Sequence, residues 1–207
     1  MRAVSAGPSV VSVASVVENY HGDHGEHGES QVHCAAVHRG NRRKLMTAGV
    51  MTGMFLAALE ATIVGTAMPT VVAAVGGLAH FSWVFSAYLL TSTVSVPLWG
   101  KLSDLWGRRL FYQLAIGIFL VGSVLSGLSQ TMPQLIAARA LQGLGAGGLI
   151  PLGMTIIGDI YTLEERARMQ GLFSGVWGLS SVIGPLIGGF ITDQLSWRWV
   201  FFINVPF

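Results

Sequence analysis

The sequence predicts an all-α membrane protein with five complete membrane-spanning helices and the start of a sixth. Two observations support this fold class. Hydrophobic residues make up 52% of the 207-residue chain and charged residues only 11%, whereas a soluble domain carries about 25% charged residues. The apolar residues also form runs close to the ~20 residues that a membrane helix needs, without the alternation of a barrel strand.

The apolar runs follow one another from Leu45 to the end of the chain. The first four span residues 45–69, 81–99, 110–128 and 133–157, and the fifth spans residues 169–191. A sixth begins near Trp199 and reaches only Phe207. The chain therefore divides into a polar tail, residues 1–44, and a membrane part, residues 45–207.

The tail contains a His-rich tract, in which His21, His24 and His27 are followed by His33, Cys34 and His38. Such a tract could bind zinc or nickel. Its polar composition favours disorder, however, and supplies no packed scaffold that would fix the geometry of a metal site. We therefore expect a disordered cytoplasmic tail and no metal site.

The basic residues predict which helix ends face the cytoplasm. If the tail is cytoplasmic, the outer connections hold only Arg198, and the inner connections hold nine basic residues: Arg39, Arg42, Arg43, Lys44, Lys101, Arg108, Arg109, Arg166 and Arg168. Cytoplasmic loops carry such an excess of positive charge. We expect a multi-pass protein of the cell membrane, surrounded by the lipid bilayer, with a cytoplasmic N-terminus. The short basic clusters between apolar runs fit inner loops better than a patch that binds nucleic acid.

Glu60 and Arg139 are the two ionisable residues at membrane depth. At 1.5 Å per residue, Glu60 lies about 13 Å from the outer end of the first helix, and Arg139 lies about 9 Å from the outer end of the fourth. Opposite charges at similar depth are expected to pair or to face a water-filled cavity. We expect Glu60 to exchange a proton, with its pKa set by burial near the guanidinium; a static ion pair is the alternative.

Several motifs lie in order along these runs. Residues 59–69 read L-E-A-T-I-V-G-T-A-M-P, residues 100–109 read G-K-L-S-D-L-W-G-R-R, residues 139–145 read R-A-L-Q-G-L-G, and residues 178–189 read G-L-S-S-V-I-G-P-L-I-G-G. Residues 196–206 add S-W-R-W-V-F-F-I-N-V-P. Together they resemble the signatures of the major facilitator superfamily, and in particular its branch of fourteen-span drug:proton antiporters.

The resemblance covers residues 45–207 and implies part of the N-terminal six-helix half of a major facilitator fold, in which substrate binds between two halves. It also implies that Glu60, Arg139 and Gln142 serve proton coupling in the cavity, with the proton gradient as energy source and no cofactor. Glu60 replaces the aspartate of the antiporter signature and keeps its carboxylate. Gly65 replaces an asparagine, which leaves the substrate open.

The charged segment from residue 100 to residue 109 is expected to be a tight cytoplasmic turn, because Gly100 and Gly107 allow unusual backbone angles. The resemblance implies that Asp104 contacts the second transporter half and is linked through Arg108, beside Arg109, to Asp159. The alternative is a solvated turn whose arginines only set the orientation of the chain.

The fifth run carries the signature Gly178, Gly184, Pro185, Gly188 and Gly189, which resembles the pattern associated with antiporters. Close helix packing and a proline kink explain the same residues, and the two interpretations are compatible.

Gly143, Gly145 and Gly148 match a dinucleotide-binding pattern, but that pattern needs a preceding strand. They lie inside an uninterrupted apolar run, so we expect them to let membrane helices approach closely.

These observations favour a transporter over an enzyme. We expect proton-coupled antiport of drugs or other small amphipathic compounds, performed together with a C-terminal half that this chain lacks. A symporter or importer of the same fold, or a non-transporting membrane subunit, is the alternative.

Overall fold

The computed structural model describes residues 27–206, with side chains from residue 43 onward. The chain divides into two units, Met1–Leu45 and Met46–Phe207. All regular secondary structure in the described residues is helical. The predicted all-α class is therefore confirmed for this part of the chain.

The five long helices are α2 (His27–Val75), α3 (Phe81–Trp106), α4 (Arg108–Leu128), α5 (Met132–Ile160) and α6 (Leu163–Gln194). A 3-10 turn, η2 (Leu78–His80), precedes α3, and the short helix α7 (Trp199–Phe202) follows α6. Five of the described helical segments are long and apolar enough to cross a membrane: residues 43–75, 78–106, 108–128, 132–160 and 163–194. Their number and order agree with the prediction, and most extend beyond the apolar runs.

The helix α2 begins at His27, well before the apolar run that starts at Leu45. The backbone of residues 27–44 is thus helical, contrary to the predicted disorder. No proline interrupts this stretch, and extending an existing helix avoids the costly nucleation step. The rest of the predicted tail, and the side chains of its His-rich tract, lie outside the described residues.

The segment from residue 100 to residue 109 is also more helical than predicted. The helix α3 continues through Gly100 to Trp106, α4 begins at Arg108, and Gly107 alone joins them. The prediction that Gly100 forms a turn is wrong, because charged side chains at a helix end do not by themselves stop the helix. Gly107 has a φ of 103°, a backbone conformation that residues other than glycine rarely adopt.

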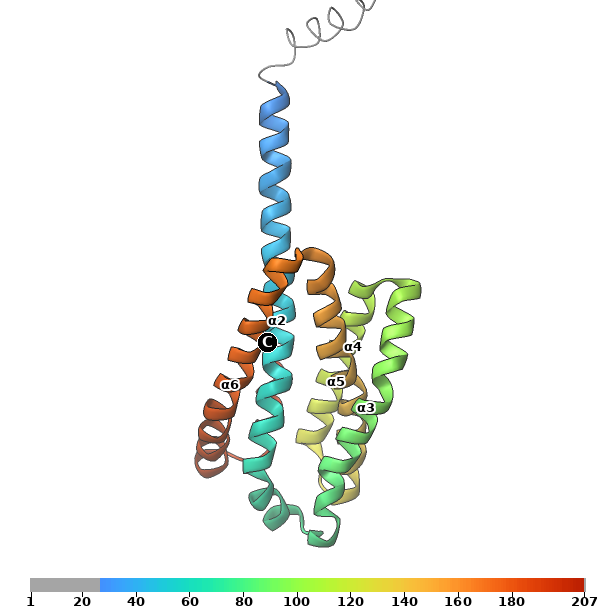
Figure 1. Ribbon diagram of the computed structural model, residues 1–207. Coiled ribbons are helices and arrows are strands. Elements are labelled where there is room, and N and C mark those ends of the chain that lie inside the picture. The colour runs from blue at the N-terminus through green and yellow to red at the C-terminus, as the bar shows by residue number, and fades with distance from the viewer. Residues whose placement is uncertain (1–26, 207) are drawn as a thin grey trace, which may run out of the picture. The chain divides into compact units, whose positions relative to one another are not determined.

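The helix α5 packs against both α3 and α4, and glycines on two of its faces make this possible (Figure 1). A Cβ on Gly143 would lie 3.0 Å from the Cα of Tyr88 on α3. A Cβ on Gly145 would lie 2.6 Å from the carbonyl oxygen of Ala115 on α4. The helix runs without a break through these glycines, so they serve close packing as expected. A dinucleotide site would need a strand directly before the glycines, and the residues before them in α5 are helical.

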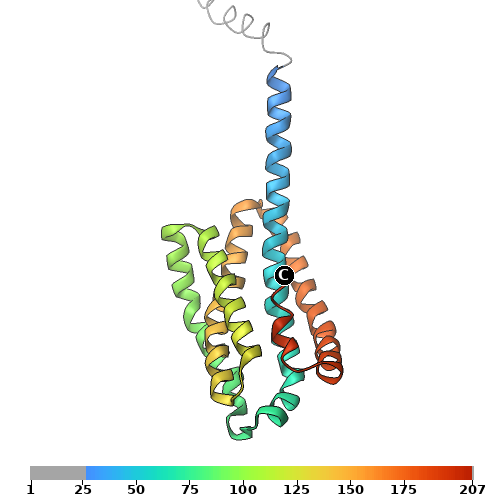
Figure 2. The same ribbon diagram turned by 180° about the vertical axis from the view of Figure 1, so that it is seen from behind.

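Opposite this group, the part of α2 in the second unit lies beside α6 in both views (Figures 1 and 2). Buried apolar side chains form two clusters at different heights of α2 and α5. One includes Met54 and Leu149, and the other includes Ile63 and Leu135. Glu60 and Arg139 fall between these heights along their helices, so the ionisable pair lies between the two apolar clusters.

Candidate functional site

The centre of the site is an ion pair between α2 and α5. Arg139 Nη1 donates a hydrogen bond to Glu60 Oε1 at 2.5 Å. Arg139 is 2% exposed and Glu60 is 1% exposed. Burial disfavours both charges, and each offsets part of the cost for the other. The structure thus brings together the two residues that the depth argument places at the same level.

Arg139 has two further neighbours besides Glu60. Its Nη1 also donates to Oε1 of Gln142, one turn along α5, at 2.7 Å. Its guanidinium carbon lies 4.1 Å from the ring centroid of Tyr88 on α3, a cation–π geometry. Gln142, predicted as a site residue, is therefore in place, whereas Tyr88 was missed because an aromatic residue in an apolar run carries no special signal.

The second oxygen of Glu60 is held from the other side of the bundle. Asn204 Nδ2, just after α7, donates to Glu60 Oε2 and to Ser123 Oγ on α4, the latter at 2.9 Å. Ser123 Oγ donates in turn to the carbonyl oxygen of Phe201 at 2.7 Å. Asn204 lies in a motif noted from the sequence, but no role was assigned to it; a polar residue inside that apolar stretch was the available signal.

Some buried atoms of this network have no hydrogen-bond partner among the described residues: Arg139 Nε, Gln142 Nε2 and Asn204 Oδ1. Two are donors and one is an acceptor. Buried polar atoms are normally paired, and exceptions often mark functional sites. The network therefore has unused donors and an unused acceptor with which it can rearrange.

An apolar groove of about 370 Å³ lies next to this network. Its walls come from α2, α3, α5 and α6, and its lining includes Ala61, Tyr88, Ala146, Pro151 and Trp177. Tyr88 belongs to both features, since its ring lines the groove and faces Arg139. A molecule in this groove would therefore lie one side chain away from the ion pair.

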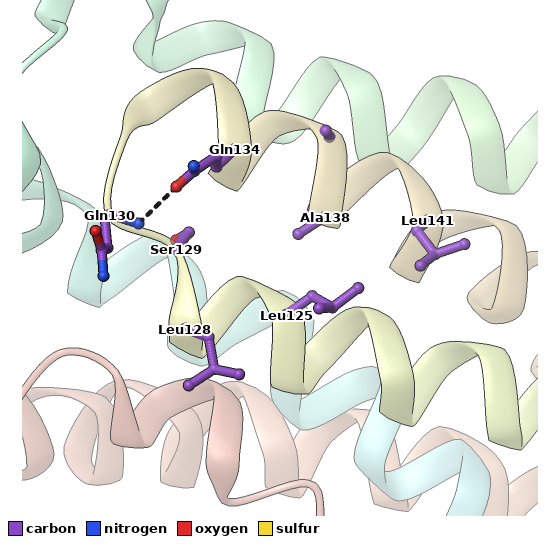
Figure 3. A pocket seen from close by; sticks show the side chains of 8 residues that line it. Leu125, Leu128, Ser129, Gln130, Gln134, Ala138 and Leu141 are labelled. Carbon is purple, nitrogen blue, oxygen red and sulfur yellow. Dashed lines mark hydrogen bonds between the residues drawn. The ribbon is translucent and has the colours of Figure 1, made fainter.

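A second groove, of about 630 Å³, lies between the end of α4 and the start of α5 (Figure 3). Leu125, Leu128 and Leu141 supply apolar walls, and the backbone N–H of Gln130 donates to Gln134 Oε1 at 3.0 Å. None of the site residues predicted from the sequence lines it.

The charged residues at the junction of α3 and α4 form a small ion-pair network. Arg108 donates to Asp159, at the end of α5, and through Nη2 to Asp104 Oδ1 at 3.2 Å. Arg109 points elsewhere and donates to the sulfur of Met46 at 3.2 Å. Asp104 and Asp159 are more than half exposed, so these pairs contribute at most about 1 kcal/mol each to stability.

The glycines predicted on α6 divide into two groups. Gly184 and Gly188 face α2, where a Cβ on Gly184 would lie 2.7 Å from the Cβ of Thr62. Thr62 Oγ1 also donates to the carbonyl oxygen of Ser180 at 3.1 Å. Outside their own helix, no described atom lies within 4 Å of a Cβ built on Gly178 or Gly189. Pro185 lies inside α6, one residue after Gly184.

Residues 50–207 match the family described as Major Facilitator Superfamily. Multidrug transporter protein MdtP of Bacillus subtilis is 50% identical over 166 residues, which cover 80% of this chain and 31% of that protein. Multidrug resistance protein 3 of the same organism is 47% identical over 163 residues, or 79% and 32% of the two chains. The chain thus spans about a third of the length of these relatives.

Solved structures resemble this chain in fold. The D-xylose-proton symporter superposes with a TM-score of 0.67 at 16% identity, over 76% of this chain and 44% of that one. The human organic anion transporter MFSD10 superposes with a TM-score of 0.64 at 18% identity, over 79% and 45% of the two chains.

Proposed function

The chain belongs to the major facilitator superfamily of membrane transporters, and we propose that it forms part of the N-terminal half of a proton-coupled exporter of drugs or other small amphipathic compounds. Two of its relatives carry the names multidrug transporter and multidrug resistance protein. The proposal places the transporter in the cell membrane with a cytoplasmic N-terminus, because that orientation puts the basic connections inside. A C-terminal half, outside this chain, supplies the opposite wall of the cavity.

The observation that carries the proposal is the buried pair of Glu60 and Arg139. The guanidinium favours the charged carboxylate, whereas burial favours the neutral acid, so two opposing effects act on Glu60. Arg139 also contacts Gln142 and the ring of Tyr88, and in the proposed cycle these neighbours compensate its charge when Glu60 is protonated. The site can therefore hold one proton or none, which is what exchange of a proton for a substrate requires.

The groove beside Tyr88 is the proposed surface for substrate. Its lining is mainly apolar, with one aromatic ring from α3 and one from α6, which suits flat or amphipathic molecules. Because Tyr88 also touches Arg139, a cation or a dipole in the groove changes the electrostatic environment of the pair. Substrate in the groove and a proton on Glu60 would then compete through the same ion pair, which would couple export to proton entry without a cofactor.

Replacing Glu60 by glutamine in the full-length transporter should reduce gradient-driven efflux to the level of membranes without transporter, because the amide cannot release a proton. Glu60→Asp, which keeps the acid on a shorter side chain, should retain part of the activity. The measurement is substrate movement in inverted vesicles with and without an imposed proton gradient. Glu164→Gln, at an exposed acid in the first turn of α6, is the matched control. Wild-type coupling in Glu60→Gln would end the proposal.

The ion pairs of Arg108 are the proposed cytoplasmic latch, in which Asp104 meets the second half of the transporter. Asp104→Asn and Arg108→Gln should each slow efflux, and the double variant should be no slower than the worse single one. Members of one charge network are coupled by about 0.5–3 kcal/mol, and the cycle is read from efflux rates. Lys101→Gln is the control on the same helix. Strictly additive effects would leave Arg108 with an orienting role only.

A further inference from the structure

We propose that Asn204 follows the protonation of Glu60 by rotating its side-chain amide, so that it donates to the carboxylate through Nδ2 and accepts from the protonated acid through Oδ1. This inference rests on the proposed proton exchange at Glu60. It assigns a positioning role to a residue outside the α2–α5 pair, and it links the pair to α7 and α4.

The geometry around Asn204 supports the first of these two states. Asn204 is fully buried, and its Nδ2 donates to Glu60 Oε2 and to Ser123 Oγ. Ser123 uses its own proton on the carbonyl oxygen of Phe201, so its oxygen acts as an acceptor toward Asn204. A negatively charged Glu60 can only accept hydrogen bonds, and the Ser123 oxygen accepts because its own proton is already donated. Both partners therefore require Asn204 to present its amide N–H groups.

The unpaired atom of the amide supports the second state. Asn204 Oδ1 has no hydrogen-bond partner among the described residues although it is buried. When Glu60 binds a proton on Oε2, that oxygen becomes a donor, and two donors then face each other across the contact. A half-turn of the amide brings Oδ1 to the new O–H group, which replaces a repulsive contact with a hydrogen bond. Only the proton moves between chemical groups, and no other bond forms or breaks.

The charged and titratable groups around Glu60 leave this role to Asn204. Arg139 on α5 faces the other oxygen, and the ring of Tyr88 on α3 lies against its guanidinium. Ser123 on α4 is uncharged, and α6 approaches α2 with Ser180 and Gly184, which are also uncharged. Arg139 can only donate, and the amide oxygen of Gln142 already accepts from Arg139. Asn204 is therefore placed against Oε2 with both a donor and an unused acceptor.

Rotation of the amide would also change the contact between α7 and α4. In the observed state the Asn204 N–H groups bridge Glu60 on α2 and Ser123 on α4. After rotation Nδ2 leaves Ser123, and Oδ1, which takes its place, can accept the Ser123 hydroxyl proton that the Phe201 carbonyl accepts in the observed state. Protonation on α2 thereby alters how the chain after α7 is held, which is a route from proton binding to helix movement.

The test is infrared difference spectroscopy of the full-length transporter between high and low pH, with natural and with ¹³C-labelled asparagine. Wild type should show a protonated-carboxyl band and a label-sensitive amide carbonyl band with the same pH midpoint. Both should vanish in Glu60→Gln, and the amide band alone should vanish in Asn204→Leu. Ser126→Ala, which removes a buried hydroxyl of α4 that bonds only its own helix, should keep both bands.

Asn204→Asp provides a second variant should the leucine disturb folding. Two acids in contact should titrate in two steps separated by more than about one pH unit. A carboxyl band from Glu60 without the amide band, or an amide band that survives in Glu60→Gln, would overturn the role of Asn204. So would a single unshifted step in Asn204→Asp, or a wild type without the carboxyl band.

Failure of the proposed function has a different signature. If both bands appear as expected but substrate efflux is independent of the proton gradient, then proton coupling is wrong and the link between Glu60 and Asn204 stands. If efflux is gradient-driven but the amide band is absent, only the role of Asn204 is lost.

Discussion

Replacing Arg139 by leucine is expected to destabilise the folded protein by about 3–5 kcal/mol, the cost of breaking a buried ion pair by removing one partner. The reason is the burial of Glu60, whose carboxylate would lose its only charged partner and keep uncharged amides such as that of Asn204. Lowering the pH should recover part of the loss, since the neutral acid is less costly to bury. Thermal unfolding in detergent, measured across a pH series, reports this difference.

A double variant makes this expectation specific. Arg139→Leu combined with Glu60→Leu removes both charges, and apolar replacements of buried ion pairs are often neutral or stabilising by about 1–4 kcal/mol. The double variant should therefore be more stable than Arg139→Leu alone, although it cannot exchange a proton. Arg168→Leu, at an exposed arginine of α6, should change stability by no more than about 0.5 kcal/mol. Additive losses from the two substitutions would show that the pair is not coupled.

Replacing Gly145 by leucine should also be strongly destabilising, because it forces α4 and α5 apart. A Cβ at this position would already lie 2.6 Å from the carbonyl oxygen of Ala115 and 2.8 Å from the Cα of Phe119, and backbone atoms cannot move aside as side chains do. Overpacking a close contact usually costs about 1–3 kcal/mol, and we expect the upper end or more here. The yield of monodisperse protein and its melting temperature provide the measurement.

Gly117 supplies the matched control for this substitution. It lies on α4, the partner helix, yet outside its own helix no described atom lies within 4 Å of a Cβ built on it. Gly117→Leu adds the same side chain to the same helix pair and should be neutral or slightly stabilising, because leucine is a better helix former than glycine by up to about 1 kcal/mol. Equal stability of the two variants would mean that the approach of α4 to α5 is not as close as the structure shows.

The helices and the pair of Glu60 and Arg139 could be predicted from the sequence, because each depends only on positions counted along the chain. A membrane-spanning segment needs a minimum apolar length, so α2 to α6 appear as runs. The depth of a residue follows from counting along a helix, so Glu60 and Arg139 could be matched without knowing how α2 and α5 pack. The unbroken helix through Gly145 followed from the same continuity of apolar residues.

The positions of helix ends, and the side-chain contacts that depend on how each helix is rotated about its axis, could not be predicted in this way. Lys101 and Asp104 are charged, but both are compatible with a helix, and the sequence does not reveal that α3 continues past them. Asn204 reaches Glu60 only because α7 packs against α4 in a particular register. In the same way, the signature glycines of α6 separate into Gly184, against α2, and Gly178, which faces no other described helix.

The junction at Gly107 limits where the chain can tolerate insertions and deletions. With one residue between α3 and α4, there is no spare backbone to absorb an insertion. One extra residue inside the last turn of α3 would rotate the remainder of that helix by about 100° and carry Asp104 away from Arg108. The connection between α2 and α3, with Gly76, Gly77 and the η2 turn, has more backbone to adjust. Sequences related to this one should therefore vary in length before α3 and keep a constant length between Asp104 and Arg108.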